Sequence, residues 1–256
     1  MSARLLEAQG LEKYYGALRV TKNVSLHVDA GEVLAVIGPN GAGKTTLFKV
    51  LTGEVDLQGG RVTFDGRDIT SMPAHQRVRL GSGRTFQVAR VFPEMTALEN
   101  VVVAIESVSA AGPAPRFRLG WWPRREVQDL AMQHLAEVGL AEKSAMHAGT
   151  LSHGDKKRLE LACCLALKPR ILMLDEPTAG MSPGDRRQAV ELIMRIKRDH
   201  DLSIMLTEHD MGVVFGMADR ILVLNYGELV AEGTVDEVRA NEKVREIYLG
   251  SGALHA

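Results

Sequence analysis

A glycine-rich segment, GPNGAGKTT, spans residues 38–46, between an apolar run that ends at Gly38 and a pattern typical of a helix. Its spacing fits G-x-x-x-x-G-K-[ST], in which glycines let backbone N–H groups close around phosphate oxygens. Lys44 would reach the β- and γ-phosphates, and the Thr45 hydroxyl would coordinate Mg²⁺. A chance glycine-rich turn is the alternative, but it would not require the flanking strand and helix. The predicted nucleotide contacts are Gly38, Pro39, Asn40, Gly41, Ala42, Gly43, Lys44, Thr45 and Thr46.

Two neighbouring acids, Asp175 and Glu176, end the apolar run ILMLDE. A carboxylate at the end of a buried strand could hold Mg²⁺ through water, and we expect Asp175 to do so. Glu176 stands one residue further on, before Pro177, and could accept the proton of an attacking water. Taken alone, the two acids could equally be caps of the next turn. The phosphate loop earlier in the chain favours the catalytic interpretation.

Two more polar residues end strand-like runs. Gln87 ends GRTFQ and could contact both the water shell of the metal and a neighbouring subdomain. His209 ends SIMLTEH and could donate a hydrogen bond to a γ-phosphate. In isolation, an exposed loop glutamine and a structural histidine would be the simpler interpretations.

The segment LSHGD, residues 151–155, predicts the start of a helix and a second anion site. Ser152 is a preferred N-cap residue, and Asp155 stands three positions further on, as in a capping box. An exposed helix N-terminus attracts anions. Because the chain already has a phosphate loop, the sequence raises the question of whose phosphate this second site would bind.

Strand-like and helix-like patterns alternate along the chain, which predicts an α/β fold with a parallel sheet. Residues 5–28 form two alternating runs with Gly16 in the turn, which predicts an antiparallel pair. GRTFQ, residues 83–87, is expected to be a short strand leading out of the sheet. We expect a nucleotide-binding core over residues 1–87 and 163–256, and an inserted helical subdomain over residues 88–162.

The overall composition excludes several classes of protein. The chain has 31 Lys and Arg, 32 Asp and Glu, a net charge of −1 and 5% aromatics, so nothing points to a nucleic-acid partner. The adjacent Cys163 and Cys164 cannot form a structural disulfide, and we expect two small apolar side chains in a reducing cytoplasm. The longest apolar run, LACCLAL, has seven residues, whereas a membrane span needs about 20. Any link to a membrane is therefore expected to go through a partner.

A short patch, WWPRR, occupies residues 121–125. It could touch a membrane surface or a partner. An ordinary loop with packed tryptophans is the simpler interpretation.

Five segments together resemble the motifs of the ABC ATPase family. GPNGAGKTT, TFQ, LSHGD, ILMLDE and TEHD occur in the order of the Walker A, Q-loop, signature, Walker B and H-loop motifs, and the match covers nearly the whole chain. RTFQVARVFPEMTALENV, the insertion that follows it, and LDEPTAGMSP resemble more narrowly the ATPases of branched-chain amino acid importers. The resemblance implies a P-loop NTPase core with an antiparallel β subdomain and an inserted α-helical subdomain.

The resemblance also implies a function and partners. The chain would bind and hydrolyse ATP with Mg²⁺ at the cytoplasmic face of the inner membrane, as a peripheral subunit. Two such subunits, identical or sister chains, would energise two membrane-spanning permease subunits, and a solute-binding protein outside the membrane would act indirectly. The catalytic residues would be Glu176, His209 and Gln87, and the metal ligands Thr45, Gln87 and Asp175.

Two contacts with ATP follow from the resemblance alone. Tyr15, in KYYGAL, is similar in place to the aromatic residue that stacks on adenine. The signature segment would face the γ-phosphate of ATP bound to the other subunit, which would explain the second anion site. The signature residues are Ser152, His153, Gly154 and Asp155.

The signature segment departs from the family pattern LSGGQ at two positions, His153 and Asp155. A carboxylate next to a γ-phosphate is repelled by like charge, so we expect Asp155 to turn back and cap its own helix.

Related functions remain alternatives. The ATPase of a lipopolysaccharide-type exporter resembles this chain, although the insertion at residues 106–125 argues against it. A non-transport ABC ATPase usually carries a coiled-coil arm or a second cassette, and neither is visible here. The signature segment and His209 exclude a plain P-loop kinase. No residue identifies the solute.

Overall fold

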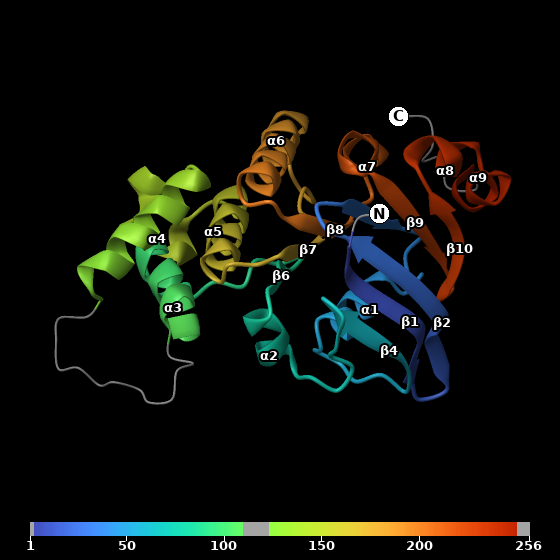
Figure 1. Cartoon of the computed structure of the whole chain (residues 1–256). Helices are drawn as coiled ribbons and strands as arrows, with labels where there is room; N and C mark the ends of the chain where they lie inside the picture. The colour runs from blue at the N-terminus through green and yellow to red at the C-terminus, as the bar shows by residue number, and fades with distance from the viewer. Residues whose placement is uncertain (1–2, 110–122, 250–256) are drawn as a thin grey trace.

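The computed structural model describes residues 3–109 and 123–249. Two β-sheets form one part of the molecule, and a helical region stands beside them (Figure 1). Trp121 and Trp122, the tryptophans of the predicted patch, lie outside the described residues.

The first sheet is antiparallel and has the strand order β2-β1-β4-β5. β1 and β2 pair along their lengths and turn at Gly16, whose φ is 60°, as the sequence predicts. Buried and exposed residues broadly alternate along β1 because one face packs on the core and the other does not. The strands are β1 Arg4–Tyr15, β2 Leu18–Asp29, β4 Gly59–Phe64 and β5 Arg67–Asp68.

The second sheet has the order β10-β9-β3-β8-β7-β6 and is parallel except for β10. Every residue of β3, β7 and β8 is buried, as expected for central strands of a parallel sheet. These three strands run side by side, so their carboxyl ends meet at one edge. The strands are β3 Val33–Ile37, β6 Ser82–Arg84, β7 Ile171–Asp175, β8 Ser203–Thr207, β9 Arg220–Asn225 and β10 Glu228–Gly233.

The predicted strand over residues 83–87 is shorter than expected. β6 ends at Arg84, and Thr85 makes one more backbone bond, to the Met173 carbonyl. The next N–H group, that of Phe86, donates to the Glu160 carboxylate instead of to a strand. A side-chain acceptor from a distant helix therefore ends this strand.

The remaining helices pack on the sheets or extend from them, and two one-turn 3-10 segments precede α5. They are α1 Lys44–Leu51, α2 Ala74–Arg79, α3 Ala97–Ser109, α4 Arg125–Glu137, η1 Ala141–Lys143, η2 Ala148–Thr150, α5 His153–Ala166, α6 Pro183–Asp199, α7 Met211–Met217, α8 Val235–Ala240 and α9 Glu242–Leu249. Within residues 3–109 and 123–249, no helix combines the length and apolar character needed to cross a membrane.

Helices α3, α4 and α5 contact one another in the helical region (Figure 1). α5 continues to Ala166, so the boundary that the sequence suggests after residue 162 falls inside this helix. Leu165 of α5 and Leu172 of β7 belong to the same hydrophobic cluster. The division into a core and an insertion remains an interpretation, with α5 common to both.

The two cysteines lie near the end of α5. Cys164 is fully buried, and its thiol donates to the Arg84 carbonyl. Burial raises the pKa of Cys163 to about 12. Both thiols are therefore protonated at neutral pH, in agreement with the predicted role as small apolar side chains.

The Arg77 guanidinium fixes the end of α1, the helix that follows the phosphate loop. It donates to the carbonyls of Val50 and Leu51 at 2.9 and 2.8 Å, and to those of Met72 and Thr70. The carbonyls of the last turn of α1 lack partners within the helix. The Val50 carbonyl also accepts from the Gly53 N–H at 3.1 Å, whereas that of Leu51 has Arg77 as its donor. Burial lowers the pKa of Arg77 to about 10, so the group stays charged at neutral pH.

We expect Arg77→Met to destabilise the fold by about 2–5 kcal/mol, because it keeps much of the volume but removes the Arg77 donors from the carbonyls of Leu51, Thr70 and Met72. Urea unfolding followed by circular dichroism measures the change. The matched control is Arg79→Met, an exposed position on the same helix, where the expected change is below about 0.5 kcal/mol. Equal effects at both positions would refute the capping role.

Candidate active site

The loop between β3 and α1 has the backbone that the sequence predicts for a phosphate site. A Cβ at Gly38 would stand 2.2 Å from the Leu224 carbonyl oxygen, and one at Gly43 would stand 2.7 Å from that of Val20. Both glycines also have positive φ, 156° and 104°. The sequence therefore needs glycine at these two positions for the loop to pass β2 and β9 closely.

A pocket of about 560 Å³ opens beside this loop. Residues 40–46 line it, together with Glu176 and His209, which follow β7 and β8. Thr207 pairs with Val36 of β3 on one side and with Asp175 of β7 on the other. This register brings the ends of three strands, and the polar residues after them, to one place.

Lys44 is buried and lies folded back across the loop. Its Nζ donates to the carbonyls of Gly38 and Pro39 at 2.6 and 3.1 Å. Burial lowers its pKa, although the charges of Glu176 and Asp175 oppose that shift. The ammonium group thus stands at the mouth of the loop, with donors that could exchange these carbonyls for phosphate oxygens.

Glu176, Gln87 and His209, predicted from three separate segments, meet in the structure. Gln87 Nε2 donates to one carboxylate oxygen of Glu176 at 2.9 Å, and His209 Nε2 lies 2.9 Å from the other. Glu176 has a φ of 50°, a left-handed conformation that is uncommon for glutamate. That conformation turns the carboxylate away from the direction of β7 and toward its two partners.

Asp175, the predicted magnesium ligand, is held by two neighbours. Arg84 donates to Oδ2 at 3.1 Å, and the Thr207 hydroxyl donates to Oδ1 at 2.8 Å. The other end of the Arg84 guanidinium pairs with Glu54 at 2.5 Å. The carboxylate therefore has a fixed orientation before any ligand arrives.

The donors near the pocket fit Mg²⁺ bound together with substrate phosphates. Mg²⁺ in such sites takes one or two carboxylates and completes its shell with phosphates and water. Thr45 offers a hydroxyl, Asp175 a carboxylate, and Gln87 an amide oxygen. Within the described part of the chain no three His, Cys, Asp or Glu residues cluster closely enough to hold a metal by themselves.

The signature segment begins α5 as the sequence predicts, with Ser152 as the N-cap. The Ser152 hydroxyl accepts from the Asp155 N–H at 3.1 Å and donates to the Asp155 carboxylate at 2.8 Å. Lys143, which the sequence did not indicate, donates to the same carboxylate at 2.6 Å. Burial raises the pKa of Asp155, but the hydrogen bonds from Lys143 and Ser152 outweigh it and keep that pKa below its usual value.

Asp155 therefore turns back onto its own helix start, as expected. Its carboxylate bonds the Ser152 hydroxyl rather than a backbone N–H, so the full reciprocal capping box is not formed. Ser152 and His153 remain exposed at the helix N-terminus.

The signature segment and the phosphate loop line different pockets of the chain. Residues 152–155 line a cavity between α5 and α6, whereas residues 40–46 line the pocket with Glu176, and the two lining sets share no residue. The phosphate pocket of one chain is therefore formed without its own signature segment.

Tyr15 is not brought to the phosphate pocket. The residue is 47% exposed, and the Lys13 ammonium lies 5.2 Å from its ring centroid. Leu18 and Arg19, on the other side of the turn, line the pocket instead. The adenine contact of Tyr15 remains a prediction from the resemblance.

Besides Lys143, sequence reasoning missed three charged residues around the site: Arg84, Lys157 and Glu160. Glu160 is 4% exposed, and its carboxylate accepts from the N–H groups of Arg90 and Phe86 at 2.8 and 3.2 Å. Burial raises its pKa to about 7, against the effect of these two bonds. A glutamate between two leucines in an otherwise apolar stretch of α5 was the signal that could have identified it.

A phosphate loop on a parallel sheet, with a carboxylate held at its mouth by an amide and an imidazole, defines a nucleotide-hydrolysing cassette of the P-loop class. The chain belongs to the ABC transporter family, whose model matches residues 21–179. A second model, the branched-chain amino acid ATP-binding cassette transporter, matches residues 228–253.

Several ATP-binding proteins are similar to this chain along nearly their whole length. The chain is 42% identical to the high-affinity branched-chain amino acid transport ATP-binding protein BraF of Pseudomonas aeruginosa, over 98% of this chain and 99% of that protein. It is 40% identical, with the same coverage, to the corresponding protein LivG of Escherichia coli. The solved ADP conformation of an ATP-binding cassette of an ABC transporter is 32% identical, with a TM-score of 0.84 over 97% of this chain and all of that one.

The raised pKa of Glu160 predicts a pH-dependent stability. Between pH 4.5, the ordinary carboxyl value, and pH 7, the folded chain binds a proton that the unfolded chain has released. Stability should therefore fall as pH rises through this window, by about 3 kcal/mol at most. Glu160→Gln should remove that part of the slope in urea unfolding measured at several pH values. An unchanged slope in Glu160→Gln, or the same change in the exposed control Glu142→Gln, would refute the assignment.

Proposed function

We propose that this chain is the ATP-binding and ATP-hydrolysing subunit of an importer for branched-chain or other hydrophobic amino acids. Two ATPase subunits, identical or sister chains, would close on ATP and reopen after hydrolysis at the cytoplasmic face of the membrane. Two membrane-spanning permease subunits would receive this motion. A solute-binding protein would deliver the amino acid from outside without touching this chain.

The contact of Glu176 with Gln87 and His209 at the mouth of the phosphate pocket carries the proposal for hydrolysis. In this assignment the Glu176 carboxylate accepts the proton of the attacking water. Gln87 and His209 fix the direction of that carboxylate, and the half-exposed His209 would contact the γ-phosphate by exchanging its Glu176 partner for a phosphate oxygen. A plain phosphate-binding loop would not need this group of three.

Phosphate binding would use the residues of the loop itself. Lys44 would exchange its two carbonyl partners for phosphate oxygens, and the loop N–H groups would bind the remaining oxygens. Mg²⁺, held by Thr45 and Asp175 with Gln87 nearby, would neutralise charge on the phosphates. Positioning and charge neutralisation of this kind supply most of the rate enhancement in phosphoryl transfer.

The need for two subunits is supported by the separation of the two pockets within one chain. The signature N-terminus is exposed and lies apart from the phosphate loop. An exposed helix N-terminus is an anion site, so we assign it to the γ-phosphate held by a second chain. The signature residues Ser152, His153, Gly154 and Asp155 would then complete the partner's site.

A surface for the permease subunits lies between β6 and α5. Val88, Phe92 and Met146 are 75%, 56% and 43% exposed, which is high for apolar side chains. A bridge between Thr96 and His147 places the Phe92 and Met146 segments side by side. Gln87 directly precedes this surface in the chain, and it hydrogen-bonds the Glu176 carboxylate. Docking at the surface would therefore shift the position of that carboxylate.

The solute class is supported by the relatives that the chain resembles. The proteins at 40–42% identity are named for branched-chain amino acid transport, and the match at residues 228–253 is to a model of the same name. A lipopolysaccharide export ATP-binding protein of Acidithiobacillus ferridurans is 34% identical over 97% of this chain. The export alternative therefore has weaker support, and nothing in the structure favours a non-transport ATPase.

Glu176→Gln should retain ATP binding and lose turnover by about 10²- to 10⁴-fold, because the amide cannot accept a proton. Steady-state ATPase and equilibrium ATP binding, measured on the same preparation, test this. The exposed Glu191→Gln should leave both unchanged. Turnover of Glu176→Gln within a factor of two of the parent would remove Glu176 from the mechanism.

Ser152→Gly, made in the Glu176→Gln background, should bind ATP as a monomer but lose ATP-driven dimers at protein concentrations at which the Glu176→Gln chain dimerises fully. Gly is a tolerable N-cap that costs only a few tenths of a kcal/mol, yet it has no hydroxyl for a phosphate. Light scattering with and without ATP measures the dimer. Full dimerisation of Ser152→Gly would leave the serine as a helix cap only.

A further inference from the structure

One helix, α5, links three parts of the proposed site: the N-terminus assigned to a second chain, the segment of Glu176 and the segment of Gln87. Its N-cap, Ser152, is exposed at the end that we assign to a second chain. Lys157 and Glu160, three positions apart on one face of the helix, contact the segments that carry Glu176 and Gln87 in the same chain. About one and a half helical turns separate Ser152 from Lys157.

Lys157 holds the backbone of the catalytic carboxylate. Its Nζ donates to the Glu176 carbonyl at 2.8 Å and approaches the Pro177 carbonyl at 3.5 Å. The Glu176 N–H donates to the Thr207 carbonyl at 3.1 Å. A left-handed conformation of a glutamate persists only when its surroundings enforce it. For Glu176, β8 holds the backbone on one side and α5 holds it on the other.

Glu160 holds the segment around Gln87. Its two carboxylate oxygens each accept one backbone N–H, from Phe86 before Gln87 and from Arg90 after it. Gln87 therefore sits in a short loop with both ends tied to α5. A shift of α5 would displace the amide that orients the Glu176 carboxylate.

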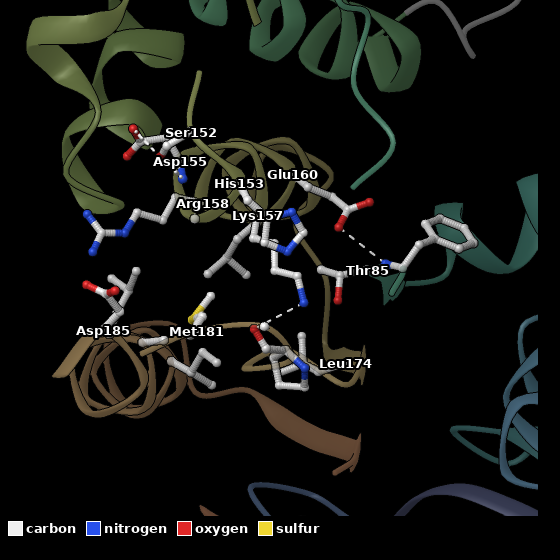
Figure 2. A pocket seen from close by; sticks show the side chains of 18 residues that line it. Thr85, Ser152, His153, Asp155, Lys157, Arg158, Glu160, Leu174, Met181 and Asp185 are labelled. Carbon is white, nitrogen blue, oxygen red and sulfur yellow. Dashed lines mark hydrogen bonds between the residues drawn. The ribbon is translucent and has the colours of Figure 1, made fainter. Parts of the chain in front are cut away.

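The cavity beside these contacts leaves α5 room to move. It measures about 370 Å³ and lies between α5 and α6, and its lining includes Ser152, Asp155, Lys157 and Glu160 (Figure 2). The pocket is open to solvent on one side. At this face α5 borders solvent-accessible space, so a change in its position there does not have to compress a packed core.

We propose that Lys157 and Glu160 are positioning residues that couple the signature end of α5 to Glu176 and Gln87 of the same chain. This inference rests on the proposed function, because it requires ATP on a second chain to engage Ser152. Engagement would fix α5, and α5 would fix the base of its own site through these two side chains. Each subunit would thereby hydrolyse its ATP only when its partner is also loaded.

The first test replaces Lys157 by Met, which keeps the aliphatic stem and removes the donor. We expect ATP binding by the monomer, ATP-driven dimers in the Glu176→Gln background and the melting temperature to stay near the parent. The kcat should fall by about 10- to 100-fold, the range that a misplaced catalytic group produces. Lys157→Arg, which keeps a donor, should recover much of that loss.

The matched control is Lys156→Met, which removes the same group one residue earlier. Lys156 donates to the Gly149 carbonyl and contacts neither Glu176 nor Gln87. It should retain the parent kcat. Glu160→Gln gives up one of its two acceptor oxygens and should lower kcat less than Lys157→Met does.

The second test is a double-mutant cycle of Ser152→Gly and Lys157→Met, with kcat measured at saturating ATP and at protein concentrations that saturate each dimer. If both act through α5, the double variant should lose about as much as the worse single variant. Losses that multiply would mean two independent sites and would overturn the coupling.

The outcomes separate this inference from the function on which it rests. A parent chain that neither hydrolyses ATP nor dimerises on it would refute the proposed function and the coupling together. An active parent in which Lys157→Met and Lys156→Met have the same kcat would refute the positioning role alone. The positioning role would also be refuted if Lys157→Met lowered the melting temperature together with kcat and Lys157→Arg did not restore kcat.

Discussion

Glu176 follows β7 with a φ of 50°, and the arrangement of the site depends on this one backbone conformation. In an extended conformation the carboxylate would continue the alternation of the strand instead of meeting Gln87 and His209. The β7–β8 register supplies the Thr207 carbonyl on one side, and Lys157 of α5 supplies a donor on the other. The sheet and the helical region thus both determine where the proton acceptor stands.

The elements and site residues that could be predicted from the sequence are those determined by residues close to them in the chain. Buried strands were visible as apolar runs, and the phosphate loop as glycines where the backbone passes Leu224 and Val20 too closely for a Cβ. The helix start at Ser152 followed from cap chemistry that involves only neighbouring residues. Glu176 and His209 could be selected because parallel strands end at a common edge.

The parts that sequence did not predict depend on contacts between distant segments. The strand over residues 83–87 stops early because Glu160, far along the chain, takes the Phe86 N–H. In the sequence Lys157 has no feature that distinguishes it from a surface lysine. In the structure it contacts the Glu176 carbonyl, which is far from it along the chain. The adenine contact of Tyr15, which is exposed, was taken from the resemblance alone and stays a prediction.

The central claim is that the phosphate loop of one chain and the signature segment of another bind the same ATP. The most direct measurement is a crystal structure of the Glu176→Gln chain with Mg²⁺ and ATP. We expect two chains, with each γ-phosphate near Lys44 of one chain and within hydrogen-bond distance, about 3 Å, of Ser152 Oγ of the other. A γ-phosphate contacted by Lys44 and Ser152 of the same chain, or by no Ser152 at all, would contradict it.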